Sequence, residues 1–447
     1  MRKVEQISPE ARAQPASSVL SRQLLLSLYL PALALSLGTG IATPVIPLFA
    51  KSFGVDFGAA SLVVILTGFG SLAATLPAGY LMDRIGRRPI LLAGPLLTAL
   101  SAFLIASAHT FPELLVYRFI GGAAAQMWQQ SRVTIITDTG AARSRGRQIT
   151  WMMAMQRVGN LVSPAIGGFL AAGFGLRAPF LVYGALSLLA FVPTYLLVKE
   201  STPRRLDRRA ADEGAISEWR TVINALRTRQ ISCYMAAQFL ANIARGQAAG
   251  SGVVLLYAAY AYDIGPSTLG LLSASNSAIG LPIGFTSGYL MDRFGRKVTI
   301  VPGFAGIFVS TLITAATAAF HAPFALFVPA FLLMNGCQSV TGGNLQVLAS
   351  DLAPAQARGR FFAISRLMSA GGAAFSPVAF SAASSLGYGA SFGVRALAAL
   401  AVSLIIGFGV GETVGRDAQE SAPAATRGDA LLAKTSASSV ADAASPR

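Results

Sequence analysis

The stretch GYLMDRIGRR, from Gly79 to Arg88, returns 209 positions later as GYLMDRFGRK, from Gly288 to Lys297. Eight of the ten positions are identical, and the other two change Ile to Phe and Arg to Lys. We call these two charged stretches the islands, because each interrupts a long apolar run. A repeat at nearly half the length of a 447-residue chain predicts two homologous halves rather than a solenoid of short units.

The composition is that of a membrane protein. Hydrophobic residues make up 53% of the chain and charged residues 12%, whereas soluble domains carry roughly 25% charged residues. A bilayer core of about 30 Å takes roughly 20 apolar residues as a helix, which satisfies its own backbone hydrogen bonds. The sequence therefore predicts an all-α membrane protein with twelve transmembrane helices. The expected spans are about 24–49, 59–80, 89–109, 112–137, 149–171, 178–198, 231–259, 267–289, 298–320, 322–350, 361–385 and 390–412.

The basic residues indicate the orientation of these spans. The formal net charge is +16, and 27 of the 35 Lys and Arg fall in the N-terminus, the even-numbered loops and the C-terminus. The odd-numbered loops hold only Lys51 and Arg177. By the positive-inside rule, both termini and both islands are expected in the cytoplasm, in a plasma (inner) membrane. The charge thus reports topology, and no nucleic-acid partner is expected.

Further matches support the two halves. In the first half, Asp138 lies seven residues before the sequence Arg145-Gly146-Arg147. The same pattern occurs 213 positions later, where Asp351 lies seven residues before Arg358-Gly359-Arg360. The Ser-Pro pair at Ser163 likewise returns 213 positions later at Ser376. The expected domains are an N-terminal cytoplasmic tail (1–20), two membrane bundles (21–198 and 231–415), a charged cytoplasmic linker (199–230) and a disordered cytoplasmic tail (416–447).

The islands, the twelve spans and the internal termini together resemble the major facilitator superfamily, over roughly residues 21–415. The resemblance implies two pseudo-symmetric six-helix bundles around a central cavity, with the substrate site near the midplane and transport by alternating access. It also implies that the islands form a cytoplasmic gate, which holds the two bundles together in the outward-open state. The gate residues expected on this basis are Gly79, Asp83, Arg84, Gly86, Arg87, Arg88, Asp138, Arg145, Gly288, Asp292, Arg293, Gly295, Arg296, Asp351 and Arg358.

Within the gate, Asp83 and Arg87 are expected to contact the start of the eleventh span. Asp292 and Arg296 are expected to contact the start of the fifth. Gly79 and Gly288 would allow close helix approach, and Gly86 and Gly295 suit a tight turn.

Two further motifs concern the subfamily. Arg118 resembles the fourth-span arginine that is linked to proton coupling in proton-driven members. The fifth-span run is similar to an antiporter motif, with Ser163 in place of a glycine; its members are Gly159, Ser163, Pro164, Gly167 and Gly168. The charged residues of the islands, and the pairs of Asp138 with Arg145 and Asp351 with Arg358, also resemble motifs of sugar porters. The seventh span, however, lacks the glutamine pattern of that subfamily. The subfamily stays open.

The charges inside the spans are all basic. Arg118, Arg132, Arg157, Arg245, Arg366 and Arg395 lie within predicted helices, whereas all 19 acidic residues lie in loops, tails or helix ends. Many proton-coupled carriers use a buried carboxylate, whose pKa burial raises. Here the sequence leaves three options: protons move through Asp138 or the gate acids, through Arg118, or not at all.

The cargo site is expected among polar residues at membrane depth. Arg245 is costly there unless something offsets its charge, and two readings remain open: it binds an electron-rich group of the cargo, or it packs helices by bonding to carbonyls. The cavity candidates are Gln126, Gln129, Gln238, Asn242, Arg245, Asn276, Asn335 and Gln338.

The sequence predicts a secondary active transporter, not an enzyme, with no catalytic residues, cofactor or metal. The expected activity is proton-coupled efflux of small organic or drug-like compounds by a monomer in the lipid bilayer, with protons as the coupling ion. Two alternatives stand beside it. One is proton-coupled uptake, by symport, of a sugar or organic anion, and the other is a transport-fold membrane sensor or receptor.

Overall fold

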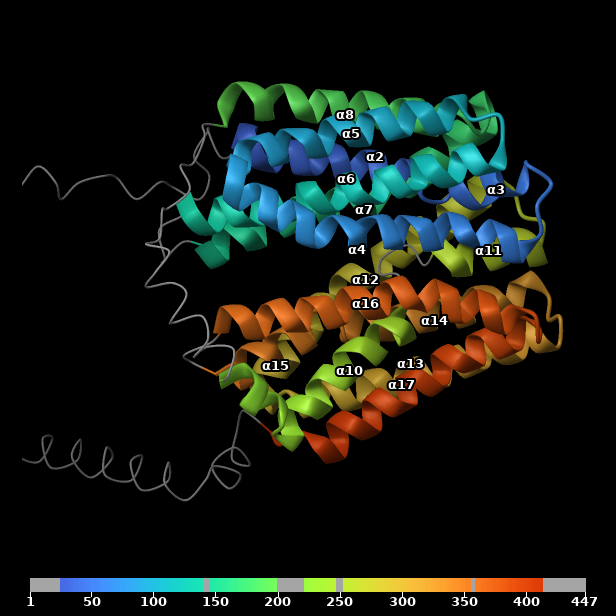
Figure 1. Cartoon of the computed structure of the whole chain (residues 1–447). Coiled ribbons are helices and arrows are strands. Elements are labelled where there is room, and N and C mark those ends of the chain that lie inside the picture. Colours follow the sequence, from blue (N-terminus) through green and yellow to red (C-terminus); the bar gives the residue numbers. More distant parts are fainter. Residues whose placement is uncertain (1–24, 140–144, 199–220, 247–251, 355–357, 413–447) are drawn as a thin grey trace, which may run out of the picture. The chain divides into compact units, whose positions relative to one another are not determined.

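The computed structural model describes residues 25–139, 145–198, 221–246, 252–354 and 358–412. Over these residues no strand occurs, and long helices run side by side within each half (Figure 1). The main elements are η2 (Leu25–Tyr29), α2 (Leu30–Ala42), α3 (Ile46–Lys51), α4 (Phe57–Ile85), α5 (Arg87–Ser107), α6 (Phe111–Thr139), α7 (Arg145–Phe174), α8 (Ala178–Leu197), α10 (Arg229–Arg245), α11 (Gly252–Ala261), α12 (Pro266–Phe294), α13 (Lys297–Ala319), α14 (Phe324–Val340), α15 (Asn344–Leu352), α16 (Arg358–Ser384) and α17 (Tyr388–Gly409). The predicted tails 1–20 and 416–447 and most of the linker 199–230 lie outside the described residues.

Seven helical stretches in this part of the chain are both long and apolar enough to cross a bilayer. They are Leu25–Ala42, Phe57–Met82, Arg87–Ser107, Ala178–Leu197, Lys297–Ala319, Phe324–Leu352 and Tyr388–Gly409. Four other helices, α6, α7, α12 and α16, are more polar but have 27 to 30 residues. At 1.5 Å per residue such helices are at least about 40 Å long, which exceeds the core of a bilayer. The predicted all-α membrane fold is confirmed.

Three predicted spans are divided in the structure. The span predicted over 24–49 comprises η2, α2 and α3, and a turn at 43–45 separates the last two. The span predicted over 231–259 consists of α10 and α11, and α10 ends at Gly246 with a φ of +67°. The span predicted over 322–350 consists of α14 and α15, which are separated at Gly343 with a φ of +87°. A positive φ ends a regular helix and favours glycine.

Short polar signals mark where individual helices begin. Asp56 precedes α4, and its carboxylate accepts the backbone N–H groups of Gly58 and Ala59. Glu113, in the first turn of α6, accepts the N–H of Thr110, the residue before the helix, at 3.4 Å, and also that of His109 at 2.9 Å. Both carboxylates satisfy N–H groups that a helix start leaves without intrahelical partners.

The contacts divide the chain into two units: Met1–Arg205 with Val254–Ser277, and Leu206–Val253 with Ala278–Arg447. In the first unit, α2 packs on α7 and α8, and α5 packs on α6 and α8. In the second unit the equivalent helices repeat these contacts: α10 packs on α16 and α17, and α13 packs on α14 and α17. The repeated packing agrees with the homologous halves that the islands indicate.

The segment 254–277 follows the midpoint of the sequence but groups with the first unit. Lys51 Nζ lies 2.6 Å from Asp263 Oδ1 and 3.1 Å from the carbonyl oxygen of Ala259. The Tyr260 hydroxyl donates to the carbonyl of Val55 at 2.8 Å. Hence polar contacts attach the α11–α12 connection to the connection between α3 and α4.

Candidate functional site

The second island forms a charged cluster where α12 ends and α13 begins. Arg296 Nε donates to Asp351 Oδ2 at 3.1 Å, and 13% and 26% of these two side chains are exposed. Glu412 accepts the backbone N–H groups of Arg296 and Lys297, each at 2.9 Å. Its carboxylate therefore lies at the positive end of α13, where N–H groups lack intrahelical partners. This cluster joins the ends of α12, α15 and α17 within one unit.

Both islands turn at a glycine, as the sequence predicts. Gly86 has a φ of +99° and Gly295 a φ of +107°, a region that side chains other than glycine rarely adopt. At Gly295 space is also limiting, because a Cβ there would lie 2.9 Å from the carboxyl carbon of Glu412. The second turn is thus shaped both by its backbone angle and by the carboxylate beside it.

The arginines of the islands contact aromatic residues. Arg84 Nη1 donates to the Tyr80 hydroxyl at 3.3 Å, and in the second half Arg293 makes the equivalent bond to Tyr289 at 3.0 Å. Arg88 Nη2 donates to the backbone carbonyl of Tyr195 at 2.9 Å, and the Arg88 guanidinium lies over the aromatic ring of the same tyrosine. These contacts anchor island side chains to their own units.

Part of the expected gate lies outside the described side chains, namely Asp83, Asp138, Arg145, Asp292 and Arg358. The expected close helix contact at Gly79 and Gly288 is not found among the described residues. A Cβ at either position would meet nothing within 4 Å. Among the described residues, no neighbouring helix lies against these two glycines.

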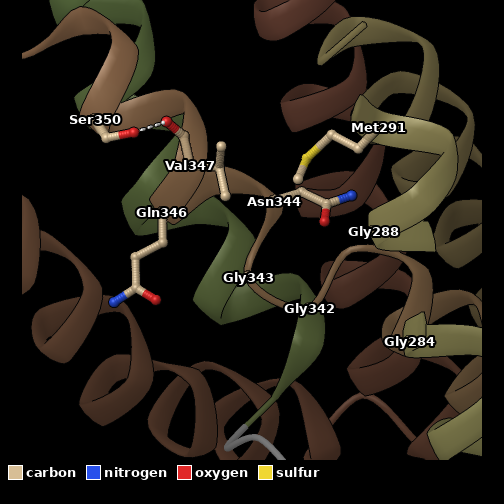
Figure 2. A pocket seen from close by; sticks show the side chains of 9 residues that line it. All are labelled: Gly284, Gly288, Met291, Gly342, Gly343, Asn344, Gln346, Val347 and Ser350. Carbon is tan, nitrogen blue, oxygen red and sulfur yellow. Dashed lines mark hydrogen bonds between the residues drawn. The ribbon is translucent and has the colours of Figure 1, made fainter. Parts of the chain in front are cut away.

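An open pocket of about 430 Å³ lies beside the second island (Figure 2). Its lining comprises Gly284, Gly288, Met291, Gly342, Gly343, Asn344, Gln346, Val347 and Ser350. Of the residues predicted as sites only Gly288 takes part, and Figure 2 shows the Gln346 side chain extending into the open space. The sequence analysis missed this pocket, although the pair Gly342-Gly343 inside an apolar run is a signal for a helix break. The pocket exists because the break between α14 and α15 replaces side chains with bare backbone.

The C-terminal end of α10 is bound by side chains from α16 and α17. Arg395, which is 2% exposed, donates from Nε and Nη2 to the carbonyl of Ala244 at 3.3 and 3.2 Å. Ser376 Oγ donates to the carbonyl of Ile243 at 3.1 Å. The last carbonyls of a helix lack intrahelical donors and carry partial negative charge. A buried cation is therefore well placed at this helix end.

Arg245, predicted as a cavity residue, is also held by carbonyls. Its Nε donates to Ala241 at 3.2 Å, its Nη1 lies 3.5 Å from the carbonyl oxygen of Thr341, and its guanidinium lies 5.9 Å from the centre of the Phe304 ring. These contacts favour the helix-packing reading of the two that the sequence left open.

The arginines of α6 lie in different surroundings. Arg118 is half-buried within electrostatic range of Tyr183, and its buried Nε has no hydrogen-bond partner among the described residues. Arg132 is fully buried, lies over the Trp128 ring and donates to Gln129. Neither has an acidic partner in the described part of the chain.

The other polar candidates do not form one cluster. Asn242 Nδ2 donates to Ser369 Oγ at 3.0 Å, and Asn335 Nδ2 donates to its own helix at Phe331. Gln238 is buried and Gln338 half-buried, and each has one buried amide atom without a hydrogen-bond partner among the described residues. Gln126 and Asn276 are half-buried, and Gln129 is exposed.

The fifth-span motif mediates close helix packing. A Cβ at Gly159 would lie 2.8 Å from the Ser36 side chain, and one at Gly167 would lie 2.0 Å from the carbonyl oxygen of Ile41, both on α2. Ser163 is buried against Gly40 of the same helix. Pro164 and Gly168 instead approach Gly270 on α12. The motif therefore brings one face of α7 against α2 and another against the segment 254–277.

Comparison with known proteins identifies the family to which this chain is similar. The family described as Major Facilitator Superfamily matches residues 28–377 and 240–440. The quinolone resistance protein NorA of Staphylococcus aureus (strain MRSA252) is 30% identical over 173 residues, which are 39% of this chain and 44% of that protein. Multidrug resistance protein 2 of Bacillus subtilis (strain 168) is 24% identical over 283 residues, covering 62% of this chain and 70% of that protein. The match to NorA thus spans less than half of its length.

Solved structures show the same fold. A D-xylose-proton symporter superposes with a TM-score of 0.72 at 20% identity, over 88% of this chain and 98% of that one. A POT family transporter in complex with a thioalcohol-conjugated peptide superposes with a TM-score of 0.71 at 13% identity, over 88% and 97% of the two chains. At these identities the likeness extends to the fold alone.

Proposed function

The chain belongs to the Major Facilitator Superfamily, and we propose that it is a secondary active transporter that works by alternating access. The observation that carries the proposal is the pair of islands at equivalent helix ends, each turning at a glycine with positive φ. The cargo is proposed to be small organic or drug-like compounds, exported in exchange for protons. The resistance proteins among the relatives favour this direction.

The islands are proposed to be the cytoplasmic gate of a monomer in the plasma (inner) membrane, with both termini in the cytoplasm. In the outward-open state Asp83 and Arg87 would contact the start of α16, while Asp292 and Arg296 would contact the start of α7. The contacts of Arg296 with Asp351 and of Glu412 with the start of α13 support this role, because they attach the second island to α15 and to the residues after α17. Solvent-exposed ion pairs contribute only about 0–1 kcal/mol each. The outward-open and inward-open states of a carrier differ by only a few kcal/mol in free energy. A gate built from a few such pairs can therefore favour one state and still allow the other to be populated.

Arg118 is the proposed residue for proton coupling. The Nε without a hydrogen-bond partner supports the assignment, because a guanidinium with an unused donor can bind a new acceptor during the cycle. Cargo contacts are proposed for Gln126, Gln129, Gln238, Asn242, Asn276, Asn335 and Gln338. Arg245 is proposed to support the cavity wall through its carbonyl contacts rather than to bind cargo directly.

The test is flux in proteoliposomes with an imposed proton gradient. Efflux by antiport predicts that an outwardly directed gradient, acidic inside, drives uptake of a quinolone into vesicles whose island side faces outward. A matched sample without a gradient should equilibrate only, and Arg118→Ala should abolish the gradient dependence while leaving slow equilibration. Quinolone flux that is absent with and without the gradient would contradict the efflux proposal.

Uptake by symport remains a second candidate, because the xylose symporter superposes over 88% of the chain. In the same vesicles, uptake of D-xylose that is driven by an inwardly directed proton gradient would favour the symport candidate. A sensor that carries nothing predicts binding without flux of any compound in the panel.

A further inference from the structure

Another pocket, of about 500 Å³, opens at the end of the first unit that lies opposite the first island. Its lining comprises Phe49, Ser52, Phe53, His109, Phe174, Gly175, Leu176 and Arg177. These residues come from the end of α3, the connection between α5 and α6, and the connection between α7 and α8. The 21 residues of α5 separate this end from the first island by about 30 Å. The whole lining belongs to one unit, and none of it was among the predicted site residues.

Three phenylalanines give the pocket an aromatic lining. The ring centres of Phe49 and Phe53 lie 5.3 Å apart in an edge-to-face arrangement, and the Phe180 ring lies 5.2 Å from that of Phe49. Phe49 is only 4% exposed, so its neighbours hold the ring in place. Phe174 is 80% exposed and offers its ring to a ligand. Rings in these positions favour a flat aromatic ligand, because offset and edge-to-face ring pairs are the preferred geometries.

Arg177 gives the same pocket a positive charge. Its Nη2 donates to the backbone carbonyl of Ala108 at 3.0 Å, which holds the guanidinium at the end of α5. A guanidinium has five N–H donors, and the Arg177 side chain is exposed, so donors remain for a ligand. His109 is also exposed and adds an imidazole that can donate a hydrogen bond. A guanidinium held in this way suits an oxyanion, which it binds through two parallel hydrogen bonds.

The described carboxylates at this end of the unit have other partners. Glu113 accepts the backbone N–H of His109 at 2.9 Å. Asp56 accepts the first N–H groups of α4, and Asp263 binds Lys51. None of these three acids lines the pocket.

Two further acids of the first unit, Asp83 and Asp138, lie too far along the chain to reach Arg177. Both α4 and α6 begin beside the pocket, directly after the connections that line it. Asp83 follows the first residue of α4 by 26 positions and Asp138 follows that of α6 by 27, or about 40 Å in each case. The charge of Arg177 therefore remains available to a ligand in the pocket.

The second half lacks this charge at the equivalent place. Gly175 and Gly387 lie 212 positions apart and both have a positive φ, of +88° and +106°. Counted from these glycines, the second half has Leu386 in place of Phe174 and a glycine in place of Arg177. The repeated connection thus forms without a basic residue, and the arginine adds a property that the fold does not require.

We propose that this pocket binds aromatic organic anions, such as aryl carboxylates and sulfonates, with the ring against the phenylalanines and the anionic group at Arg177 and His109. Its volume lies in the range of ligand pockets, roughly 300–1,000 Å³. The positive charge attracts anions and repels cations. No residue of the lining is a proposed cargo residue, and binding here does not depend on the proposed transport function. Because the islands are proposed to be cytoplasmic, the pocket would face the exterior.

Protection of a thiol measures this binding without transport. In a background with Cys233→Ser and Cys337→Ser, Ser52→Cys adds an exposed thiol to the lining. The uncharged reagent methyl methanethiosulfonate then reports the accessibility of that thiol in an uncharged detergent. Naphthalene-2-sulfonate should slow the reaction at a concentration at least tenfold lower than naphthalene-2-sulfonamide, which has the same ring without the charge. The cation trimethyl(2-naphthyl)ammonium should give no protection.

Variants of the lining separate the charge from the ring. Arg177→Gln should raise the sulfonate concentration for half protection about tenfold, as expected for the loss of a hydrogen bond to a charged group, whereas Arg177→Lys should keep most of the preference for the anion. Phe53→Leu should weaken the sulfonate and the sulfonamide by the same factor, because it removes a ring contact and no charge. As the matched control, Ser385→Cys places an exposed thiol in the connection between α16 and α17, and no compound should change its rate.

Equal protection by the anionic, neutral and cationic naphthalenes would overturn the proposal. That comparison uses one folded protein, so it stands even where Arg177→Gln loosens the end of α5. Protection by phosphatidylglycerol but by none of the naphthalenes would also overturn it, because the pocket would then hold a lipid headgroup. Protection by the sulfonate in a protein that transports no compound would support the site and contradict only the proposed transport function.

Discussion

Lys51 binds Asp263 through a 2.6 Å contact between Nζ and Oδ1, and 212 positions of sequence separate the two residues. Lys51 ends α3, whereas Asp263 follows α11 and has a φ of +48°. The Tyr260 ring lies 5.5 Å from the same Lys51 Nζ. The pair therefore belongs to a small polar and aromatic cluster that attaches the segment 254–277 to the first unit.

Exchanging the two charges tests whether this pair affects the transport cycle. Lys51→Glu or Asp263→Lys alone places like charges together, and each should reduce the rate of transport. The double variant Lys51→Glu/Asp263→Lys restores opposite charges and should recover most of the rate, as measured by flux in proteoliposomes. Equal defects in the double variant and in the single ones would show that the pairing has no role.

The pH dependence of the pair follows from the pKa of Asp263. The hydrogen bond from Lys51, and then its charge, lower the pKa of this carboxyl below its ordinary value of 3.8. A lowered pKa means that the contact contributes fully above the ordinary value and is lost only as the pH falls through the lowered one. Lys51→Ala should raise the Asp263 pKa toward 3.8, which isotope-edited infrared titration can measure. Loss of the pair between pH 5 and 7 would contradict this assignment.

Gly167→Ala should destabilise the protein because its Cβ would lie 2.0 Å from the carbonyl oxygen of Ile41. Backbone cannot move aside cheaply, so α7 and α2 must separate, at about 1–3 kcal/mol. The control is Gly173→Ala on the same helix, where a Cβ meets nothing within 4 Å; this change should be neutral or stabilising by up to about 1 kcal/mol. Thermal unfolding in detergent compares the two, and equal melting temperatures would be inconsistent with the close helix contact.

Gly295→Ala should disturb the second island. The residue would have to keep a φ of +107° and place its Cβ 2.9 Å from the Glu412 carboxyl carbon, so that the carboxylate moves away from the start of α13. The positive φ alone costs about 1–2 kcal/mol. Gly79→Ala, where the Cβ has open space, should have little effect on unfolding. Similar losses of stability in the two variants would argue against a special role for the turn.

Arg395→Met should loosen the end of α10. The change leaves the carbonyl of Ala244 without its donors, and an unsatisfied buried carbonyl costs about 1–3 kcal/mol. Hydrogen–deuterium exchange should rise at the last turn of α10, while Arg395→Lys, which keeps a charge and a donor, should give an intermediate rise. Unchanged exchange in Arg395→Met would mean that other contacts hold this helix end.

Much of this fold could be predicted from the sequence, because the information is local or repeated. The island spacing indicates two halves, and the length and apolarity of the runs predict the helices within a few residues of their ends. The glycines at 246 and 343 divide two predicted spans, and apolar composition alone does not show such a break. Composition identifies a helix, whereas a break depends on a single backbone angle.

The candidate site was less predictable, since its contacts join distant segments. Arg245 and Arg395 are similar in the sequence, both being single arginines in apolar runs. The structure places both beside carbonyls of α10. Periodicity can indicate the face of a helix on which an arginine lies, but not which neighbour that face meets.

The pair of Lys51 and Asp263 also bears on how the two halves arose. The 212-residue separation matches that of His109 and His321, which close the equivalent spans of the two halves, so Lys51 and Asp263 occupy corresponding places. Two identical copies of an ancestral half would put the same residue at both places, and like charges would repel there. The attraction could form only after the copies had diverged at this position, so the joining of the halves by this contact is younger than the duplication that produced them.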